Sequence, residues 1–311
     1  MPTQPLVQVS VKLDEPDAYY IGMDLSASYG AVAVAFSNGT TMPVARIEGS
    51  DEYKTLLAQL AWQERWEPDP PWIPVDPQQT AVLSKMIADL RFRAQKRLGV
   101  KINSTLVAAP ALPYLYDVNL KASIQDAGLE DMDGRPGGWL GASFRQPQGA
   151  MAGLGNGMCH TYWDRPTCSD EAAQLSRDCS VTILYTSNAL CVVMGTSKGM
   201  YGYQPSGTLP SSMDFKLGYN ERNHNPDESF YWAAVRERIM RGALSGAAFL
   251  PWNVTVFVHG DKDAVDDPKF REVLEDAIYD LPFGRPPIHF PDDPEFLVAR
   301  GTASIVRRGK W

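Results

Sequence analysis

Two segments of the chain share one pattern of hydrophobic and polar positions. Residues 19–36 have the sequence YYIGMDLSASYGAVAVAF, and residues 179–195 have the sequence CSVTILYTSNALCVVMG. Each contains an apolar strand, a short turn of small polar residues and a second apolar strand, which predicts a β-hairpin. Because the pattern occurs twice, it predicts a chain made of two similar halves.

Each predicted hairpin is followed by the same series of elements: a helix, a buried strand and a second helix. Apolar residues of the first long helix recur at helical spacing. In chain order the predicted segments are 76–99, 104–110 and 116–128 in the first half, and 227–244, 254–260 and 267–278 in the second. Strands that alternate with helices predict an α/β fold with mostly parallel sheet beyond each hairpin.

The last predicted element is a closing helix within residues 291–308. Asp292 or Asp293 is expected to cap its N-terminus, because a side-chain oxygen there can accept a backbone N–H. Pro294 suits the first turn of such a helix, and arginines near its C-terminal end suit the helix dipole.

The repeat also predicts how the chain is organised. We expect a mobile tail over residues 1–17, a first half over residues 18–178, and a second half with the closing helix over residues 179–311. Two similar halves predict a cleft between them. Ligands of such folds bind near the strand ends and first turns that face the cleft.

The composition predicts a large core and an acidic surface. The chain has 311 residues, of which 44% are hydrophobic, a net charge of -8 and a pI of about 5.1. This charge disfavours nucleic acid and anionic membranes as partners, and no apolar run is long enough to span a bilayer. The N-terminus lacks the features of a signal peptide, so a cytoplasmic location is expected. The oligomeric state is left open.

The cysteines and histidines predict neither a metal nor a cofactor. The cysteine spacing fits no zinc or redox template, and no C-x-x-C is present. Free thiols in a reducing compartment are therefore expected. No pair of histidines has metal-ligand spacing. The cysteines are Cys159, Cys168, Cys179 and Cys191.

Four stretches follow the order of motifs in a known superfamily. Residues 21–36, IGMDLSASYGAVAVAF, resemble I-G-I-D-L-G-T-T-Y-S-x-V-x-V, and residues 144–157, FRQPQGAMAGLGNG, resemble I-N-E-P-x-A-A-A-x-A-Y-G. Residues 181–193, VTILYTSNALCVV, take the place of F-D-L-G-G-G-T-F-D-V, and residues 257–274, FVHGDKDAVDDPKFREVL, resemble V-G-G-S-x-R-x-P-x-V. These motifs are the phosphate hairpins, connecting helix and adenosine loop of the actin and seventy-kilodalton heat-shock chaperone ATPases.

The resemblance covers most of the chain from Tyr19 onward and includes residues 104–129 and 291–305. It implies an α/β, actin-like ATPase fold of the ribonuclease H-like kind, with two pseudo-repeated halves around a cleft. The chain is much shorter than the chaperone's nucleotide-binding domain, which implies trimmed peripheral subdomains. Short, degenerate chaperone-like proteins of this form are typical of fungi, so a fungal source is expected.

The first hairpin departs from the family motif at its turn. It keeps Asp24 but has Ser26 and Ala27 where glycine and threonine are usual, while Ser28 still offers a hydroxyl. The family's glycines let backbone N–H groups approach phosphate without a Cβ in the way. Their replacement predicts a poorer phosphate site.

The second hairpin departs further. Its two acidic positions match Tyr185 and Val192, and Ser187 and Asn188 stand in the glycine run. Gln146 replaces the glutamate of the connecting helix. In this superfamily carboxylates hold magnesium through water and orient the attacking water. The one remaining carboxylate is not expected to support hydrolysis, which predicts a pseudo-ATPase.

Each candidate residue has a structural alternative. Tyr185 either fills the space of the absent phosphate or donates its hydroxyl to a ligand carbonyl. Asp24 either caps the turn or contacts a ligand, and Gln146 either begins a helix or lines the cleft. The predicted catalytic residues are Tyr185 and Gln146, and the predicted ligand-binding residues are Asp24, Ser26, Ser28, Ser187, Asn188, His259 and Gly260.

The first functional hypothesis is a pseudo-ATPase whose cleft binds an apolar small molecule. It extends to a cofactor-free natural-product cyclase, such as a norbornene-forming Diels–Alder enzyme acting on a terpenoid or polyketide, which needs a shaped apolar pocket and hydrogen-bond donors. The aromatic residues available for its walls are Trp62, Trp66, Trp72, Trp139, Trp163, Tyr231 and Trp232. The alternative is a non-hydrolysing ATP- or ADP-binding module that docks protein partners, and a slow chaperone-like ATPase is a third hypothesis.

Overall fold

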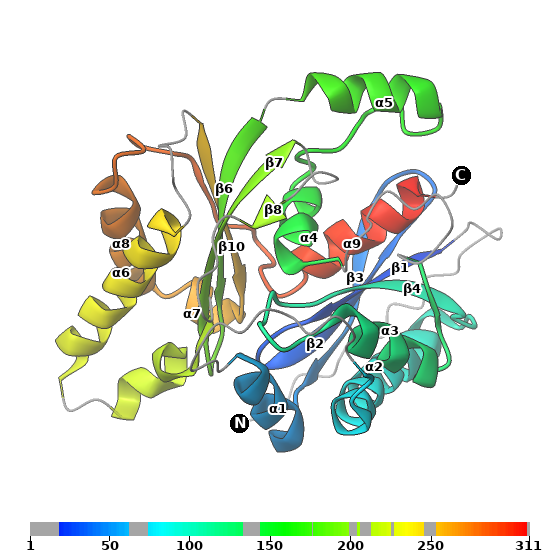
Figure 1. Ribbon diagram of the computed structural model, residues 1–311, viewed down its shortest axis with the longest axis horizontal. Coiled ribbons are helices and arrows are strands. Elements are labelled where there is room, and N and C mark those ends of the chain that lie inside the picture. The colour runs from blue at the N-terminus through cyan, green and yellow to red at the C-terminus, as the bar shows by residue number, and fades with distance from the viewer. Residues whose placement is uncertain are drawn as a thin grey trace, which may run out of the picture.

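Two mixed β-sheets lie side by side in the computed structural model, each with helices packed beside it (Figure 1). The structure describes residues 19–61, 74–132, 144–175, 177–198, 204–205, 213–224, 227–245 and 253–309. The tail predicted over residues 1–17 lies outside these ranges.

The first sheet has the strand order β3-β2-β1-β4-β5. Its strands are β1 (Tyr20–Leu25), β2 (Tyr29–Ala35), β3 (Thr41–Glu48), β4 (Ser104–Ala108) and β5 (Glu130–Asp131). β1 and β2 form an antiparallel hairpin in which Leu25 pairs with Gly30. β4 then runs parallel to β1, so that Asp24 at the end of β1 pairs with Ala108.

The second sheet repeats this plan, with the strand order β11-β10-β6-β7-β8 and β9 paired to β7. Its strands are β6 (Arg177–Tyr185), β7 (Leu190–Lys198), β8 (Gln204–Pro205), β9 (Met213–Asp214), β10 (Val254–Gly260) and β11 (Ile288–His289). β6 and β7 form the second hairpin, and β10 runs parallel to β6. Both predicted hairpins and the α/β fold class are therefore confirmed.

Helices lie in every segment where one was predicted, and also at residues 51–61, 165–174 and 262–265, where none was predicted. They are α1 (Asp51–Ala61), α2 (Pro77–Leu98), α3 (Asp117–Asp126), α4 (Gln146–Gly153), α5 (Arg165–Gln174), α6 (Glu228–Leu244), α7 (Lys262–Val265), α8 (Pro268–Tyr279) and α9 (Leu297–Arg308), with short 3₁₀ turns at Phe215–Leu217 and Tyr219–His224. The ends of α2 show why these boundaries form. The Asp76 side chain accepts from two backbone N–H groups of the first turn, and Gly99 ends the helix in a left-handed conformation with φ of 69°.

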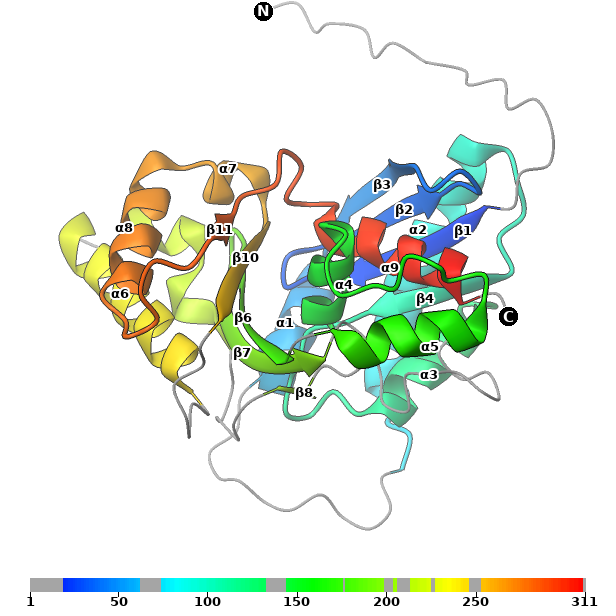
Figure 2. The same cartoon turned by 90° about the horizontal axis from the view of Figure 1, so that it is seen from above.

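Helix α9, at the end of the chain, packs against the first sheet and against α4 rather than against the second sheet (Figures 1 and 2). Glycine allows this close approach, since a Cβ on Gly301 would lie 1.9 Å from the Gly149 carbonyl oxygen. The second half of the sequence thus contributes helix α9 to the core beside the first sheet. Val298 of α9, Ala150 of α4 and Phe257 of β10 share one buried apolar cluster there.

The predicted start of the closing helix is wrong. Helix α9 begins at Leu297, its N-cap residue is Phe296, and no side chain caps it. Asp293 instead forms an ion pair with Arg300 at 2.8 Å. The residues before α9 form β11 and a turn that returns the chain from the second sheet to the first, so Asp292 and Asp293 lie before the helix.

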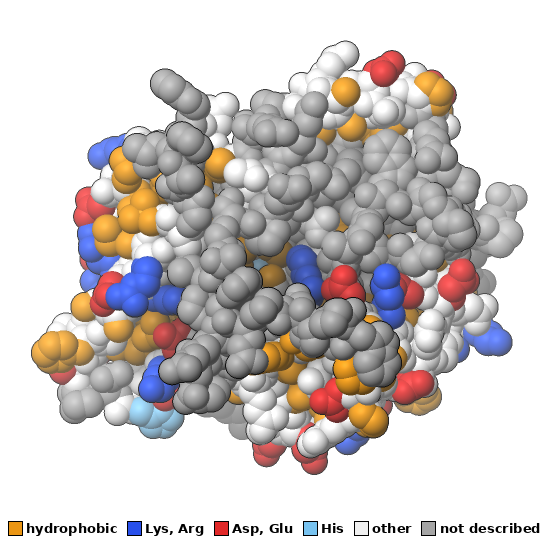
Figure 3. Space-filling view, in the orientation of Figure 1, with side chains coloured by type: hydrophobic (Ala, Val, Ile, Leu, Met, Phe, Trp, Pro, Cys, Tyr) orange, Lys and Arg blue, Asp and Glu red, His pale blue; other side chains and the backbone are white. Residues whose placement is uncertain are grey.

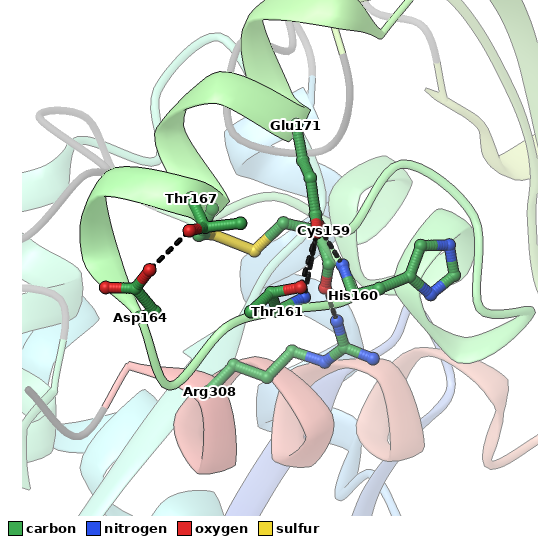
Figure 4. Close-up of a disulfide and its surroundings, with 8 residues drawn as sticks. Cys159, His160, Thr161, Asp164, Thr167, Glu171 and Arg308 are labelled. Carbon is green, nitrogen blue, oxygen red and sulfur yellow. Dashed lines mark hydrogen bonds between the residues drawn. A yellow bond between two sulfur atoms is a disulfide. The ribbon is translucent and has the colours of Figure 1, made fainter.

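The prediction of free thiols is wrong for two of the four cysteines. Cys159 and Cys168 form a disulfide with a Cα–Cα distance of 5.3 Å, while Cys179 and Cys191 are free thiols. The disulfide links the loop after α4 to the first turn of α5, and Arg308 of α9 donates to the Cys159 carbonyl beside it (Figure 4). No spacing rule could find this pair, because the fold brings the two sulfur atoms together.

None of the helices in the described ranges combines the length and the apolar character that a bilayer crossing needs.

Candidate functional site

Asp24, the carboxylate that the first hairpin keeps, is fully buried at the end of β1. Gln146, the first residue of α4, donates from Nε2 to Asp24 Oδ1 at 2.7 Å and to the Leu25 carbonyl at 3.2 Å. Burial raises the pKa of Asp24 to about 7, although the Gln146 hydrogen bond acts to lower it. Asp24 Oδ2 has no hydrogen-bond partner among the described residues. Asp24 and Gln146, which were predicted separately as a ligand-binding and a catalytic residue, are thus brought together inside the protein.

A polar cluster surrounds this carboxyl group. The Tyr53 hydroxyl donates to the Ser26 carbonyl at 2.8 Å, and Ser26, Tyr29 and Tyr53 are all buried. Burial raises the pKa of Tyr29 and of Tyr53, and the charge of Asp24 raises both further. The Ser26 and Tyr29 hydroxyls interact with each other, and neither forms a hydrogen bond of regular geometry with another described residue. Buried polar atoms of this kind usually bind internal water or a ligand.

Tyr185 lies in the core of the second half. Its hydroxyl is 2.7 Å from that of Tyr231 on α6, and its ring stacks on Phe270 of α8 at a centroid distance of 4.3 Å. Burial is the main cause that raises its pKa above the usual range. The alternative in which this hydroxyl faces the cleft is therefore wrong, because the side chain fills the core beneath the turn. Val192, the other matched acidic position, is buried in the same core.

The turns of the two hairpins are in contact. Asn188 Nδ2 in the second turn donates to the Ala27 carbonyl in the first at 3.1 Å. Asp261, which follows β10, accepts at Oδ2 from the Ser28 hydroxyl at 3.0 Å and from the Ser187 backbone N–H at 2.5 Å. The predicted residues Ser28 and Ser187 thus meet at a carboxylate that the sequence analysis did not single out, while Asn188 joins the two turns directly.

His259 and Gly260 place that carboxylate. Gly260 has a φ of 137°, and a Cβ on it would lie 1.9 Å from the Tyr185 carbonyl oxygen. Only glycine permits this approach of β10 to the end of β6. His259 was expected to face the cleft but is 1% exposed, and burial lowers its pKa to about 3. Its imidazole is therefore neutral at physiological pH and lies inside the protein rather than on the cleft surface.

Arg46 of β3 forms ion pairs with Asp261 and with two further carboxylates. Its Nη2 lies 2.6 Å from Asp261, its Nη1 2.5 Å from Glu48 and its Nε 3.1 Å from Glu295. The guanidinium also lies 4.4 Å above the ring centroid of Tyr29. Burial opposes the charge of Arg46, but its hydrogen bonds and ion pairs with these carboxylates prevail and raise its pKa. Burial raises the pKa of Glu295, against the effect of Arg46.

A cleft of about 470 Å³ opens beside this cluster. It is lined by Arg46, Glu48, Ser187, Tyr219, Asn220, Asp261, Lys262, Asp263, Ala264 and Glu295. This lining is charged and polar, whereas an apolar pocket was expected. Four tryptophans expected to form its walls, Trp62, Trp66, Trp72 and Trp139, lie outside the described residues, so that expectation stays a prediction. Trp163 is 69% exposed, and Trp232 is buried on α6.

Within the described ranges, no three acidic, histidine or cysteine side chains converge so that they could hold a metal ion. On the face shown in Figure 3, acidic and basic side chains of described residues are interspersed. The absence of a nucleic-acid partner stays a prediction.

Sequence reasoning missed the residues with the strongest interactions here, Asp261 and Arg46. Asp261 had a detectable signal, because it stands where the adenosine-loop motif that residues 257–274 resemble has a serine. A new carboxylate next to an expected phosphate site is an electrostatic departure as informative as the lost glycines. Arg46 had no local signal, because only the pairing of β3 with β2 brings it to the cleft.

Two sheets that each contain a hairpin and a strand parallel to it, with the hairpin turns meeting beside a cleft, define the actin-like ATPase fold of two similar halves. Among solved structures, the chain is similar to the ethanolamine utilization protein EutJ from Carboxydothermus hydrogenoformans. The two share 14% sequence identity with a TM-score of 0.51, over 93% of this chain and 90% of that one. Neither a model of a protein family nor a curated protein matches the chain. The likeness to EutJ shows the fold alone.

Proposed function

We propose that the protein is a pseudo-ATPase, which uses the actin-like fold to bind a small organic ligand and does not hydrolyse ATP. The observation that carries this proposal is the chemistry of the two hairpins. Asp24 is the only carboxylate at the matched acidic positions, and its Oδ1 is bound by the neutral amide of Gln146. Tyr185 stands at the acidic position of the second hairpin, with its side chain in the core.

Phosphoryl transfer by this fold needs carboxylates that position magnesium and the attacking water. A glutamine amide cannot take a proton from water, and a tyrosine that packs in the core cannot hold hydrated magnesium. Asp24, with a pKa of about 7, is also partly protonated at neutral pH. Removing a general base and metal partners costs orders of magnitude in rate, which supports loss of turnover.

The cleft supports the ligand-binding part of the proposal. Its volume of about 470 Å³ is within the usual range of small-molecule sites. A cyclase of Diels–Alder type and an apolar ligand remain predictions, because four of the tryptophans expected to line the apolar pocket lie outside the described residues. A fungal source also remains a prediction. The nucleotide-binding module is less favoured, since the Ser28 hydroxyl and Ser187 N–H that would face a phosphate already donate to Asp261.

Titration calorimetry with MgATP and MgADP, together with an assay of phosphate release, tests the proposal. We expect neither binding heat at nucleotide concentrations up to about 1 mM, a level at which even weak nucleotide sites fill, nor phosphate release above the buffer rate. Micromolar binding without turnover would favour the nucleotide-binding module. Turnover that is lost in Asp24→Asn would overturn the pseudo-ATPase.

A further inference from the structure

One carboxylate connects the two halves of the molecule. Asp261 accepts hydrogen bonds from the Ser28 hydroxyl in the β1–β2 turn, the Ser187 N–H in the β6–β7 turn and the Arg46 guanidinium on β3. Two of these donors belong to the first sheet, whereas Ser187 and Asp261 itself belong to the second. The Asp261 side chain is 12% exposed. A carboxylate so far removed from water needs such donors to compensate for its lost hydration.

These three donors form a site suited to a small oxyanion. A hydroxyl, a backbone N–H at a turn and an arginine are the groups that proteins use to bind carboxylate and phosphate oxygens. They converge on both oxygens of one group, because Ser28 and Ser187 bind Oδ2 while Arg46 binds Oδ1. The donor geometry is therefore that of an anion site whose occupant belongs to the same chain.

The backbone holds Asp261 in this place. The Asp261 N–H donates to the Tyr185 carbonyl at 3.0 Å, which fixes the end of β10 against the end of β6. Gly260 permits this contact, as shown by the missing space for a Cβ. The side chain of Asp261, the next residue, then reaches Ser187 in the β6–β7 turn and Ser28 in the β1–β2 turn.

The surrounding charges resist any second anion. Three carboxylates, from Glu48, Asp261 and Glu295, surround the single charge of Arg46. Lys262 is already paired with Asp266 at 2.7 Å. An incoming phosphate or carboxylate would add to a local net negative charge, whereas an external carboxylate that took the place of Asp261 would leave that charge unchanged. Asp261 is the carboxylate that occupies all three donors.

We propose that Asp261 is the internal ligand of an oxyanion site formed by Ser28, Ser187 and Arg46, and that it holds the two halves together by occupying that site. A carboxylate or phosphate group from outside binds there only when the Asp261 side chain is removed or withdrawn. This inference rests on the proposed function, because it explains the exclusion of a nucleoside triphosphate by the occupation of these donors by Asp261.

The test replaces the internal carboxylate by an external one. In Asp261→Ala the Ser28 hydroxyl and the Ser187 N–H lose their acceptor, and Arg46 loses one of its three carboxylate partners, so the variant should melt below the wild type. Formate at about 100 mM should raise the Tm of the variant by at least about 2 °C over the same ionic strength of chloride, because a ligand that binds only the folded state stabilises it. The wild type should respond equally to the two salts.

Three further variants isolate the site. Asp261→Asn keeps the shape of the side chain, and its amide should block formate rescue. Arg46→Gln in the Asp261→Ala background should abolish rescue by removing the charged donor. Asp263→Ala removes a different carboxylate of the same cleft and should show no specific response to formate.

Equal Tm values of Asp261→Ala in formate and chloride, or failure of that variant to fold in either salt, would overturn the internal-ligand proposal. So would equal rescue of Asp261→Asn. These results leave the pseudo-ATPase proposal standing, because that depends on nucleotide binding and turnover by the wild type. Conversely, ATP hydrolysis by the wild type would overturn the pseudo-ATPase proposal, regardless of the effect of formate on Asp261→Ala.

Discussion

Two buried ionisable groups, Asp24 and His259, have pKa values displaced in opposite senses. The pKa of Asp24 rises from 3.8 to about 7, and that of His259 falls from 6.5 to about 3, in both cases because burial disfavours the charged form. Both groups are therefore neutral over part of the same pH range. Their effects on stability have opposite signs and partly cancel in the wild type, so single variants are needed to observe them.

For Asp24 we predict stability that falls as the pH rises. The folded state holds the proton more tightly than the unfolded state, so this contribution is fully present below about pH 4 and is lost as the pH rises through about 7. The total is at most about 4 kcal/mol, from about 1.4 kcal/mol for each pKa unit. Urea denaturation of the wild type and Asp24→Asn at several pH values measures it. A difference between the two proteins that does not change with pH would contradict the raised pKa.

For His259 we predict stability that rises as the pH rises. The unfolded state binds the proton more tightly, so this contribution is present above about pH 6.5 and is lost as the pH falls toward 3. Between about pH 6.5 and 4.5 the wild type should lose roughly 2 kcal/mol more free energy of unfolding than His259→Leu, which cannot titrate. The same urea series measures this loss. Parallel pH profiles for the two proteins would show that the imidazole is not buried in its neutral form.

At the scale of elements, the contact of α4 with α9 depends on glycine. A Cβ on Gly301 would lie 1.9 Å from the Gly149 carbonyl oxygen and 2.4 Å from the Gly153 nitrogen. Both neighbours are backbone atoms, which cannot move aside as a flexible side chain can. The helix start at Leu297 and this close packing together place α9 against the first sheet.

We predict that Gly301→Ala destabilises the protein by about 1–3 kcal/mol, as overpacking does, even though alanine favours a helix by up to about 1 kcal/mol. Gly309→Ala is the matched control, because the nearest atom to its Cβ would be 3.4 Å away and its φ of -87° suits any residue. Denaturant midpoints compare the two variants. A Gly301→Ala protein as stable as Gly309→Ala would mean that α4 and α9 lie further apart.

At the scale of the whole molecule, the Cys159–Cys168 disulfide fixes the segment around α5 beside the end of α9. Arg308 donates to the Cys159 carbonyl, and Arg307 donates to the Tyr162 hydroxyl at 2.5 Å. Disulfides persist mainly in oxidising compartments, so this one does not support the expected cytoplasmic location, which stays a prediction.

We predict that the protein unfolded without reductant carries two alkylatable thiols, Cys179 and Cys191, and that reduction reveals two more. Mass spectrometry after iodoacetamide treatment counts them. Cys168→Ser should also lower the free energy of unfolding, by roughly 2–3 kcal/mol for a short loop, and Cys191→Ser serves as the comparison at a free thiol. Four reactive thiols without reductant would show that the bond does not form.

The sequence by itself determined the two hairpins and the helices and strands that follow each of them, but not β3, α1, α5 or α7. Apolar strands around a turn of small polar residues specified the two hairpins, helical spacing specified α2, and Asp76 and Gly99 specified where α2 begins and ends. These features depend on residues near one another in the chain, so patterns of period two and 3.6 record them. The loss of acidic residues at Tyr185 and Val192 and the presence of Gln146 could also be recognised from the sequence, because these positions lie within recognisable motifs.

Only the tertiary structure decided which side chains meet. Asp261 and Arg46 are far apart in the chain, and so are Arg308 and the disulfide-bonded Cys159 whose carbonyl it binds. Tyr185 turned into the core and His259 became buried because of how helices and strands pack, which a motif does not record. Burial then set the pKa values, since the loss of water around a charge depends on the whole fold and on no local pattern.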